Sequence, residues 1–245
     1  MERLRVDWRV ATVTGVVDET PHARTLVLDV DGWPGHVAGQ HADVRLTAQD
    51  GYEAQRSYSI ASAPEDATVS LTIERIDDGE VSPYLAGEVR AGDQFELRGP
   101  IGGHFTWRAQ QGGPLLLVGG GSGLVPLMAM LRHRAAESST AAAVLLVSSR
   151  TVQDILYRSE LERLAQGDGL AVHHTLTRGA PEGWDGFDRR VDAEMLSAFA
   201  PAPADAPRMF ICGPTPFVEA VADLLVGLGY EPASIHAERF GPTGG

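Results

Sequence analysis

The spacing of apolar residues changes once along this 245-residue chain, close to residue 109, and this change constrains the fold more than any other feature. Before it, short apolar–polar alternations are separated by turn sequences such as Asp31-Gly-Trp-Pro-Gly, which is typical of an antiparallel barrel or sandwich. After it, apolar strand-like runs alternate with stretches of helical spacing, which predicts a parallel sheet covered on both faces. We therefore predict two domains: an N-terminal antiparallel β-barrel over residues 1–108, and a C-terminal α/β domain with a parallel five-stranded sheet over residues 109–245.

The individual elements follow from the same two periods. In the barrel we predict one short helix, Val81–Glu88, and strands at Val10–Val17, Arg24–Val30, Asp43–Thr47, Gln55–Ser62, Thr68–Arg75 and Gln94–Arg98. In the α/β domain we predict strands at Pro114–Gly119, Ala143–Ser148, Leu170–Thr177, Met209–Cys212 and Ile235–Glu238, and helices at Leu124–Ala136, Val152–Gln166, Ala193–Phe199 and Pro216–Leu228.

Charge and cysteine content exclude several classes of protein. The 20 basic residues are all Arg, and with 33 acidic residues they leave a formal net charge of −13, which repels nucleic acid and anionic membrane surfaces. The single cysteine, Cys212, excludes a disulfide framework and a cysteine-ligated zinc or iron–sulfur site within these residues. The longest apolar runs fall well short of the ~20 residues of a membrane helix, and the N-terminus lacks a signal-peptide core. We expect a monomeric, cytoplasmic protein with no membrane insertion and no nucleic-acid partner.

A glycine-rich loop, Gly119-Gly-Gly-Ser-Gly-Leu-Val-Pro, directly follows a predicted buried strand and opens a predicted helix. Glycines at such a position let the backbone approach a pyrophosphate, and the helix start offers free N–H groups. The sequence does not match the dinucleotide fingerprint G-x-G-x-x-G. It is not a P-loop either, because no Lys follows the glycines. Four glycines in five positions exceed what a tight turn requires, so we favour nucleotide binding over a purely structural turn.

Six short motifs occur in order along the chain: Arg56-Ser-Tyr-Ser, Gly79-Glu-Val-Ser-Pro-Tyr-Leu, Gly99-Pro-Ile-Gly-Gly, Gly119–Pro126, Cys212-Gly-Pro and Glu238-Arg-Phe. Taken alone, Arg56 and Tyr58 are equally well read as a phosphate and aromatic-ring contact or as an exposed Arg beside a half-buried strand Tyr. Together the motifs resemble the ferredoxin–NADP reductase superfamily over roughly residues 8–241. More closely, the chain is similar to the reductase components that supply bacterial oxygenases, without their iron–sulfur domain.

The resemblance implies FAD and NADPH or NADH as cofactors. Arg56 would pair with the FAD pyrophosphate, Tyr58 would pack on the flavin ring, and Ser59 would hydrogen-bond near flavin N5. The remaining residues that the resemblance assigns to FAD are Ser57, Ile73, Glu74, Arg75, Val81 and Ser82. The glycine loop, through Gly120, Gly121, Ser122 and Gly123, would receive the nicotinamide cofactor.

Cys212 and Glu238 are, with Ser59, the residues expected to shape the site of hydride transfer. From the sequence alone, Cys212 is a small buried hydrophobic residue at a strand end, with no cationic neighbour to lower its pKa. The resemblance instead places Cys212, with Gly213 and Pro214, beside the nicotinamide, and matches Glu238 and Phe240 to a carboxylate and a flavin-stacking aromatic.

The resemblance implies that the adenosine ribose is recognised after the strand Ala143–Ser148. Ser149 and Arg150, with Arg158 further on, suit a 2′-phosphate because guanidinium binds phosphate bidentately, so NADPH is slightly favoured, although Asp154 lies near. No His pair has metal-binding spacing, so no metal site is expected, and His133 is predicted on a helix surface.

The predicted function is therefore an FAD-dependent NAD(P)H oxidoreductase that passes electrons to a separate acceptor protein, such as a ferredoxin or an oxygenase component. One alternative is a flavin reductase that releases reduced flavin. Another, from a different class, is a nucleotide-sensing module without turnover.

Overall fold

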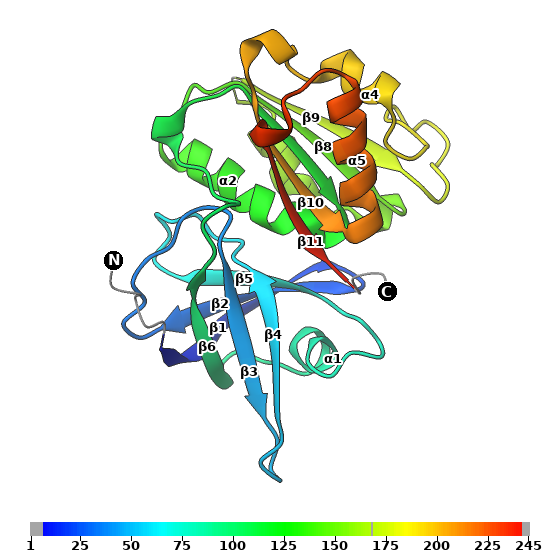
Figure 1. The fold of residues 1–245 in the computed structure, drawn as a ribbon. Helices are drawn as coiled ribbons and strands as arrows, with labels where there is room; N and C mark the ends of the chain where they lie inside the picture. Colours follow the sequence, from blue (N-terminus) through cyan, green and yellow to red (C-terminus); the bar gives the residue numbers. More distant parts are fainter. Residues whose placement is uncertain (1–6, 168, 242–245) are drawn as a thin grey trace.

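The computed structural model describes residues 7–167 and 169–241, which form two sheets arranged one above the other (Figure 1). The first sheet is antiparallel, in the order β4-β3-β6-β1-β2-β5. A bridge between Ile60 and Leu71 joins the end of β4 to β5 and closes this sheet into a barrel. Its strands are β1 (Trp8–Thr20), β2 (Ala23–Val30), β3 (His41–Thr47), β4 (Glu53–Ser59), β5 (Val69–Glu74) and β6 (Gln94–Ile101), with one helix, α1 (Ser82–Gly87).

The barrel core follows from the alternation of the sequence. Inward positions such as Leu26, Leu28 and Leu97 are completely buried, while their neighbours along each strand face outward. The predicted antiparallel barrel is thus confirmed.

The second sheet is fully parallel, in the order β11-β10-β7-β8-β9. Alternate residues of β7 serve its two faces: Leu115 and Leu117 pack under α2 and α3, and Leu116 and Val118 pack under α4 and α5. This confirms the predicted five-stranded parallel sheet. Its elements are β7 (Leu115–Gly120), α2 (Leu124–Ala136), β8 (Ala143–Ser149), α3 (Arg158–Leu164), β9 (Leu170–Leu176), α4 (Ala193–Phe199), β10 (Arg208–Pro214), α5 (Thr215–Gly227) and β11 (Ile235–Phe240).

Five single-turn 3₁₀ helices complete the described elements: η1 (Ala109–Gln111), η2 (Gly121–Gly123), η3 (Val152–Asp154), η4 (Pro203–Asp205) and η5 (Pro232–Ser234). The predicted domain boundary near residue 109 falls in η1, between the last barrel strand and the first parallel strand.

The predicted helix at Val152–Gln166 is wrong over its first six residues. The Asp154 carboxylate accepts hydrogen bonds from the backbone N–H and the hydroxyl of Thr151, which closes the single turn η3. The backbone is then extended at Ile155 and left-handed at Tyr157, which a helix does not allow, so α3 starts only at Arg158. At this break the Tyr157 side chain packs in the core beside α2 and its hydroxyl contacts the barrel.

Buried polar contacts join the two domains. The Tyr157 hydroxyl hydrogen-bonds the Thr72 hydroxyl of β5, and both side chains are buried. The Arg132 guanidinium lies over the Tyr157 ring, 4.9 Å from its centroid, and donates to the Ala61 carbonyl at 2.7 Å. Two Arg132–Glu160 hydrogen bonds of 2.6 and 3.0 Å orient that guanidinium. We call Ala61, Thr72, Arg132 and Tyr157 the domain seam.

His133 corrects another prediction, since it is buried instead of lying on a helix surface. The backbone N–H of Ala109 donates to its Nε2 at 3.1 Å, so Nδ1 carries the proton and donates to Glu65 of the barrel at 2.8 Å. The barrel loop that carries Glu65 covers a helix position that periodicity alone assigns to solvent.

Candidate active site

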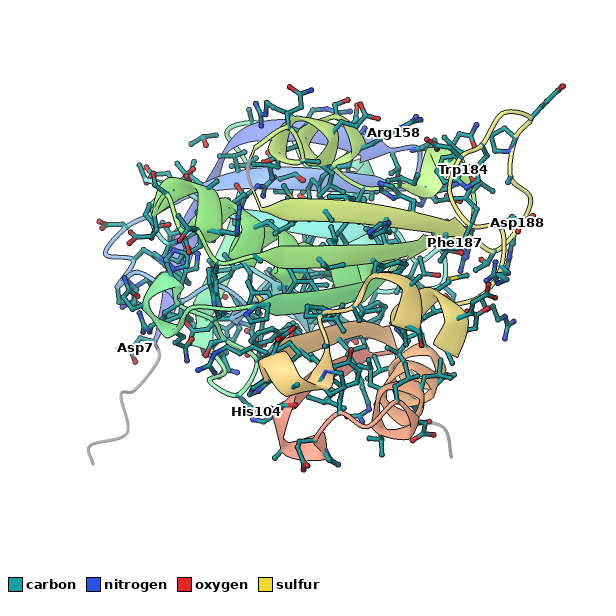
Figure 2. The ribbon with its side chains drawn as sticks, turned by 90° about the horizontal axis from the view of Figure 1, so that it is seen from above. Asp7, His104, Arg158, Trp184, Phe187 and Asp188 are labelled. Atoms are coloured by element: carbon teal, nitrogen blue, oxygen red, sulfur yellow. The ribbon has the colours of Figure 1, made fainter. Side chains whose placement is uncertain are left out.

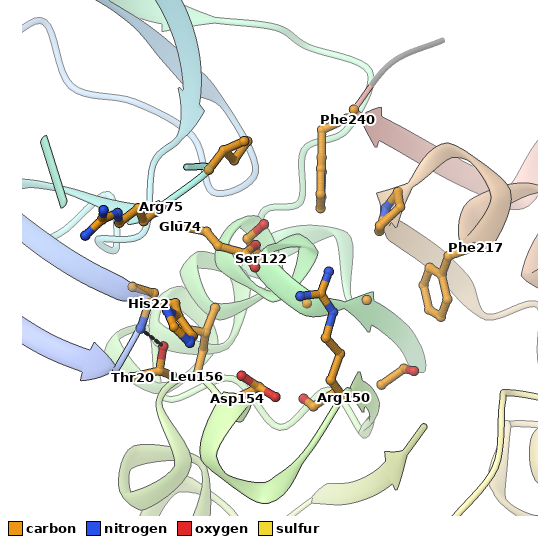
Figure 3. A pocket seen from close by; sticks show the side chains of 18 of the residues that line it. Thr20, His22, Glu74, Arg75, Ser122, Arg150, Asp154, Leu156, Phe217 and Phe240 are labelled. Carbon is orange, nitrogen blue, oxygen red and sulfur yellow. Dashed lines mark hydrogen bonds between the residues drawn. The ribbon is translucent and has the colours of Figure 1, made fainter. Parts of the chain in front are cut away.

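A cleft of about 560 Å³ opens at the carboxyl ends of the parallel strands, between them and the barrel. The strand order reverses between β7 and β10, and ligands of open α/β sheets bind at such a reversal. Figure 3 shows Glu74 and Arg75 lining one side of the cleft, Ser122 its floor, and Arg150 pointing into it. The cleft therefore brings barrel and α/β residues to one cavity.

The glycine loop needs its glycines for two separate reasons. Gly121 has φ +56°, in the left-handed region that side chains disfavour. At Gly123, a Cβ would lie 2.1 Å from the Cys212 carbonyl oxygen, so the start of α2 packs directly on the backbone of β10. The second demand holds the loop close to the carboxyl end of β10, where Cys212 lies.

Cys212 and Glu238 are neighbours across strands β10 and β11, in register with one another. Burial, and to a lesser extent the Glu238 carboxyl, raise the pKa of the Cys212 thiol, so it is not a thiolate nucleophile. Burial also raises the pKa of Glu238 to about 7. Within the described residues, Glu238 Oε2 on β11 and Thr215 Oγ1 at the start of α5 are buried without a hydrogen-bond partner. These two polar atoms and the glycine loop fit a polar cofactor that approaches the end of β10.

The barrel contributes Tyr58 and Ser59 at the end of β4. Burial raises the pKa of Tyr58 to about 12, and its ring is half-buried against the barrel core. Ser59 is paired in register with His41 of β3, and His41 Nδ1 lies 3.7 Å from Glu238 Oε1. The three residues expected at the site of hydride transfer are thus connected through His41, which the sequence did not single out.

Arg56 is exposed and held by Glu80: its guanidinium donates to the Glu80 carboxylate at 2.6 Å, and Tyr52 donates to the same carboxylate at 2.8 Å. Its neighbour Ser57 donates to Asp43 at 2.6 Å. An Arg56 guanidinium on the barrel surface remains open to further acceptors, because it has five donors.

Three further residues expected at FAD are buried. Ile73 belongs to the barrel core, and Val81 and Ser82 begin α1. The Ser82 hydroxyl accepts from the backbone N–H of Ile76 at 3.1 Å, so only backbone groups of Val81 and Ser82 remain for a ligand.

Arg150 differs from the other candidate phosphate ligand, Arg158. Arg150 points into the cleft, and its guanidinium makes no ion pair with any described residue (Figure 3). Arg158 instead pairs with Glu162 at 3.1 Å and lines a second cavity of about 480 Å³, on the α3 side near Trp184 and Phe187 (Figure 2). The structure does not bring Arg158 to the cleft.

Of the site residues expected from the sequence, nine line the cleft: Glu74, Arg75, Gly120, Gly121, Ser122, Ser149, Arg150, Pro214 and Phe240. Cys212, Gly123 and Gly213 are buried and are not among its lining residues. Sequence reasoning missed the cleft residues Thr20, His22, Leu156, Thr177 and Phe217. Only Phe217, which follows the Cys212-Gly-Pro motif by three positions, had a signal in the sequence.

Glu65, His133 and Glu137 bring three potential metal-ligand atoms within 4.8 Å of one another. Both ring nitrogens of His133 are already hydrogen-bonded within the protein, so its contacts are accounted for without a metal ion. Across residues 7–167 and 169–241, no helix combines the length and apolarity that crossing a membrane would require.

Comparison with known proteins matches each domain to a family. Residues 13–107 match the oxidoreductase FAD-binding domain, and residues 117–223 match the oxidoreductase NAD-binding domain. The chain is 37% identical to ferredoxin–NADP reductase B of Sorangium cellulosum, over 83% of this chain and 84% of that protein.

The chain is also 35% identical to the glycine betaine monooxygenase reductase subunit of Pseudomonas aeruginosa, over 84% of this chain. It spans only 56% of that relative's length. Among solved structures, an Amycolatopsis cytochrome P450 reductase superposes with a TM-score of 0.83 at 26% identity, covering 97% of this chain and 71% of that one.

Proposed function

Because the chain belongs to the ferredoxin–NADP reductase superfamily of FAD- and NAD-binding oxidoreductases, we propose that it is an FAD-dependent NAD(P)H reductase that supplies electrons to a separate acceptor protein. The observation that carries this proposal is the cleft itself. It places Glu74 and Arg75, from the FAD-binding domain, opposite the glycine loop of the NAD-binding domain. A shared cavity is what transfer between two bound cofactors requires.

On the barrel side, Arg56, Tyr58 and Ser59 would hold FAD. The half-buried Tyr58 ring would cover one face of the flavin, and Arg56 would reach the pyrophosphate with donors left over from its contact to Glu80. Ser57, Ile73, Glu74, Arg75, Val81 and Ser82 would complete the FAD contacts, chiefly through their backbone groups.

On the α/β side, the glycine loop would hold the nicotinamide cofactor, with Gly213 and Pro214 beside it. The buried, protonated thiol of Cys212 would pack against the nicotinamide without reacting, since burial disfavours the thiolate. The partnerless Oε2 of Glu238 would meet a polar group of the bound ring, which satisfies both. Bound FAD supplies the redox chemistry: it accepts two electrons from a nicotinamide and can release them singly.

NADPH is the preferred electron donor in this proposal. Arg150 is available in the cleft, which Asp154 also lines, and Thr151 donates two hydrogen bonds to Oδ2 of Asp154. A 2′-phosphate would therefore find a guanidinium in the cleft, which can bind it bidentately.

The acceptor is proposed to be a ferredoxin, an oxygenase component or another redox protein. Residues 1–245 hold a single cysteine, so they cannot ligate an iron–sulfur cluster themselves. The oxygenase reductase named among the relatives favours this class of acceptor. A monomeric state belongs to the same proposal.

Anaerobic titration of the purified chain with NADPH and with NADH tests this function. A yellow protein with stoichiometric FAD that bleaches on addition of nicotinamide supports it. A colourless protein that reduces added flavin catalytically would indicate a flavin reductase, and a colourless protein without turnover would refute both enzymatic readings.

A further inference from the structure

We propose that Tyr157 is a positioning residue of the reductase site: through its hydrogen bond to Thr72 of the barrel, it fixes residues 150–156 relative to the FAD-binding domain. We call residues 150–156 the cleft segment, because they contribute three lining residues to the α/β side of the cleft. The effect on the reaction rests on the proposed function, whereas the effect on the cleft segment can be measured without turnover.

The backbone of Tyr157 has a conformation that a bulky side chain rarely adopts. Its φ of 54° and ψ of 25° lie in the left-handed region. Two other non-glycine residues of the described chain have a positive φ, Ser138 and Ala206, and both are small and exposed. Tyr157 is instead only 4% exposed. Such a backbone persists only where the surrounding structure determines it, so the contacts of this side chain fix this point of the chain.

A series of hydrogen bonds through the barrel sets the direction in which the Tyr157 hydroxyl donates. Thr25 donates its hydroxyl proton to a Glu19 carboxylate oxygen at 2.7 Å, so in its 2.7 Å contact with Thr72 the Thr25 oxygen accepts. The Thr72 oxygen can then accept from Tyr157. Burial raises the pKa of Tyr157, so its hydroxyl keeps the proton that it donates. All the hydroxyl protons in this series thus point toward the barrel.

The ring of Tyr157 is restrained together with its hydroxyl. It packs in the apolar core beside α2, and the Arg132 guanidinium lies over it, 4.9 Å from its centroid. That guanidinium is itself held by Glu160 and by the Ala61 carbonyl. The side chain therefore belongs to the α/β core while its hydroxyl is bonded to the barrel.

The cleft segment is fixed at both of its ends. At its start, the backbone N–H of Arg178, two residues beyond β9, donates to the Arg150 carbonyl at 2.8 Å. At its other end, Tyr157 follows Leu156 directly and is bonded to the barrel. Between these ends, Arg150, Asp154 and Leu156 all line the cleft (Figure 3). A displacement of Tyr157 would therefore displace the wall of the cleft that Leu156 forms.

The groups expected at hydride transfer lie on other elements. Ser59 ends β4, Cys212 lies on β10 and Glu238 lies on β11. None of them belongs to the cleft segment, which carries Arg150, the proposed contact for a 2′-phosphate. Loss of the Tyr157 hydroxyl should therefore weaken the binding of NADPH and leave the hydride step unchanged.

The first test measures amide hydrogen exchange in the full chain as purified, for the native sequence, Tyr157→Phe and Thr72→Val. Exchange in the cleft segment should rise about 3- to 10-fold in both variants. The double variant should add little to the larger single effect, because both substitutions remove the same hydrogen bond. Tyr230→Phe is the matched control, because it removes a buried tyrosine hydroxyl that donates to the Pro201 carbonyl at 2.6 Å, within the α/β domain. The amides of β7 report any global unfolding.

A second measurement separates positioning from a general loss of structure. Tyr157→Phe should raise the KM for NADPH about 3- to 10-fold with kcat unchanged, whereas partial unfolding would lower kcat with KM unchanged. Unchanged exchange of the cleft segment in both Tyr157→Phe and Thr72→Val would overturn the proposal, as would an unchanged KM in a chain that oxidises NADPH. If the native chain oxidises neither nicotinamide, the proposed function fails, while the exchange experiment still decides whether Tyr157 fixes the cleft segment.

Discussion

Substitution of Arg150 by Ala is the sharpest probe of how this chain selects its electron donor. Arg150 points into the cleft and is exposed, and its guanidinium has no acidic partner among the described residues (Figure 3). Truncating it breaks no internal ion pair, so the effect falls on the ligand and not on the fold.

The magnitude follows from the contact that is lost. A hydrogen bond to a charged group contributes about 1.5–3 kcal/mol, and each 1.4 kcal/mol is about tenfold in affinity. We expect Arg150→Ala to reduce kcat/KM for NADPH by about 10- to 150-fold, and because Arg150 is exposed, the lower end of that range is expected at physiological salt. NADH lacks the 2′-phosphate, so its kcat/KM should not change.

The assay measures the steady-state rate at which the chain oxidises NADPH and NADH, each at low and at high ionic strength. Arg158→Ala is the matched control, because Arg158 pairs with Glu162 in the second cavity and should leave both values unchanged. Unchanged melting temperatures would show that both variants fold. The reasoning is refuted if Arg150→Ala lowers both nicotinamides equally, or if Arg158→Ala alone impairs NADPH.

Three further outcomes are expected. Arg56→Ala should weaken FAD retention by about 10- to 150-fold, since it removes a charge-assisted contact, as measured by flavin fluorescence on dilution. Cys212→Ala should slow reduction by the nicotinamide in stopped-flow experiments while FAD stays bound. Burial raises the pKa of Glu238 to about 7 in the folded chain, from its usual 4.5. The folded state then holds an extra proton between these values, so this residue's contribution to stability falls as pH rises through them, and Glu238→Gln should remove that slope in urea unfolding.

Each of these has a contrary result. Full FAD retention in Arg56→Ala would mean that the native Arg56 guanidinium contacts Glu80 and does not contact FAD. Loss of flavin from Cys212→Ala would mean that the native thiol contacts FAD and not the nicotinamide. Parallel stability profiles for the native chain and Glu238→Gln would mean that solvent reaches the carboxyl freely.

Sequence periodicity predicted the two sheets well, because the core-facing alternation of the barrel and the buried runs of the parallel sheet are local patterns. It failed where distant parts of the chain decide the outcome. Residues 152–166 have helical spacing, yet Tyr157 has a left-handed backbone and lies outside the helix. Its hydroxyl contacts Thr72, which is 85 residues earlier in the chain.

The candidate site shows the same division. The glycine loop and Cys212 could be predicted because a strand, a turn and a helix follow each other directly. The positions of Arg158 and His41 could not be predicted. Arg158 lines the second cavity, after the break that precedes α3. His41 lies 3.7 Å from Glu238 of the other domain, a contact that no local pattern indicates.

The domain seam has a consequence for building chimaeric reductases from this chain. Separating the barrel from the α/β domain would leave the Tyr157 hydroxyl and the Arg132 guanidinium facing surfaces that no longer satisfy them, and each orphaned polar group costs about 1–3 kcal/mol if it stays buried. Grafting a relative's NAD-binding domain onto this barrel should therefore succeed only when equivalents of Tyr157 and Arg132 are transplanted with it. Compatibility between the two domains would then depend on the four residues of the domain seam.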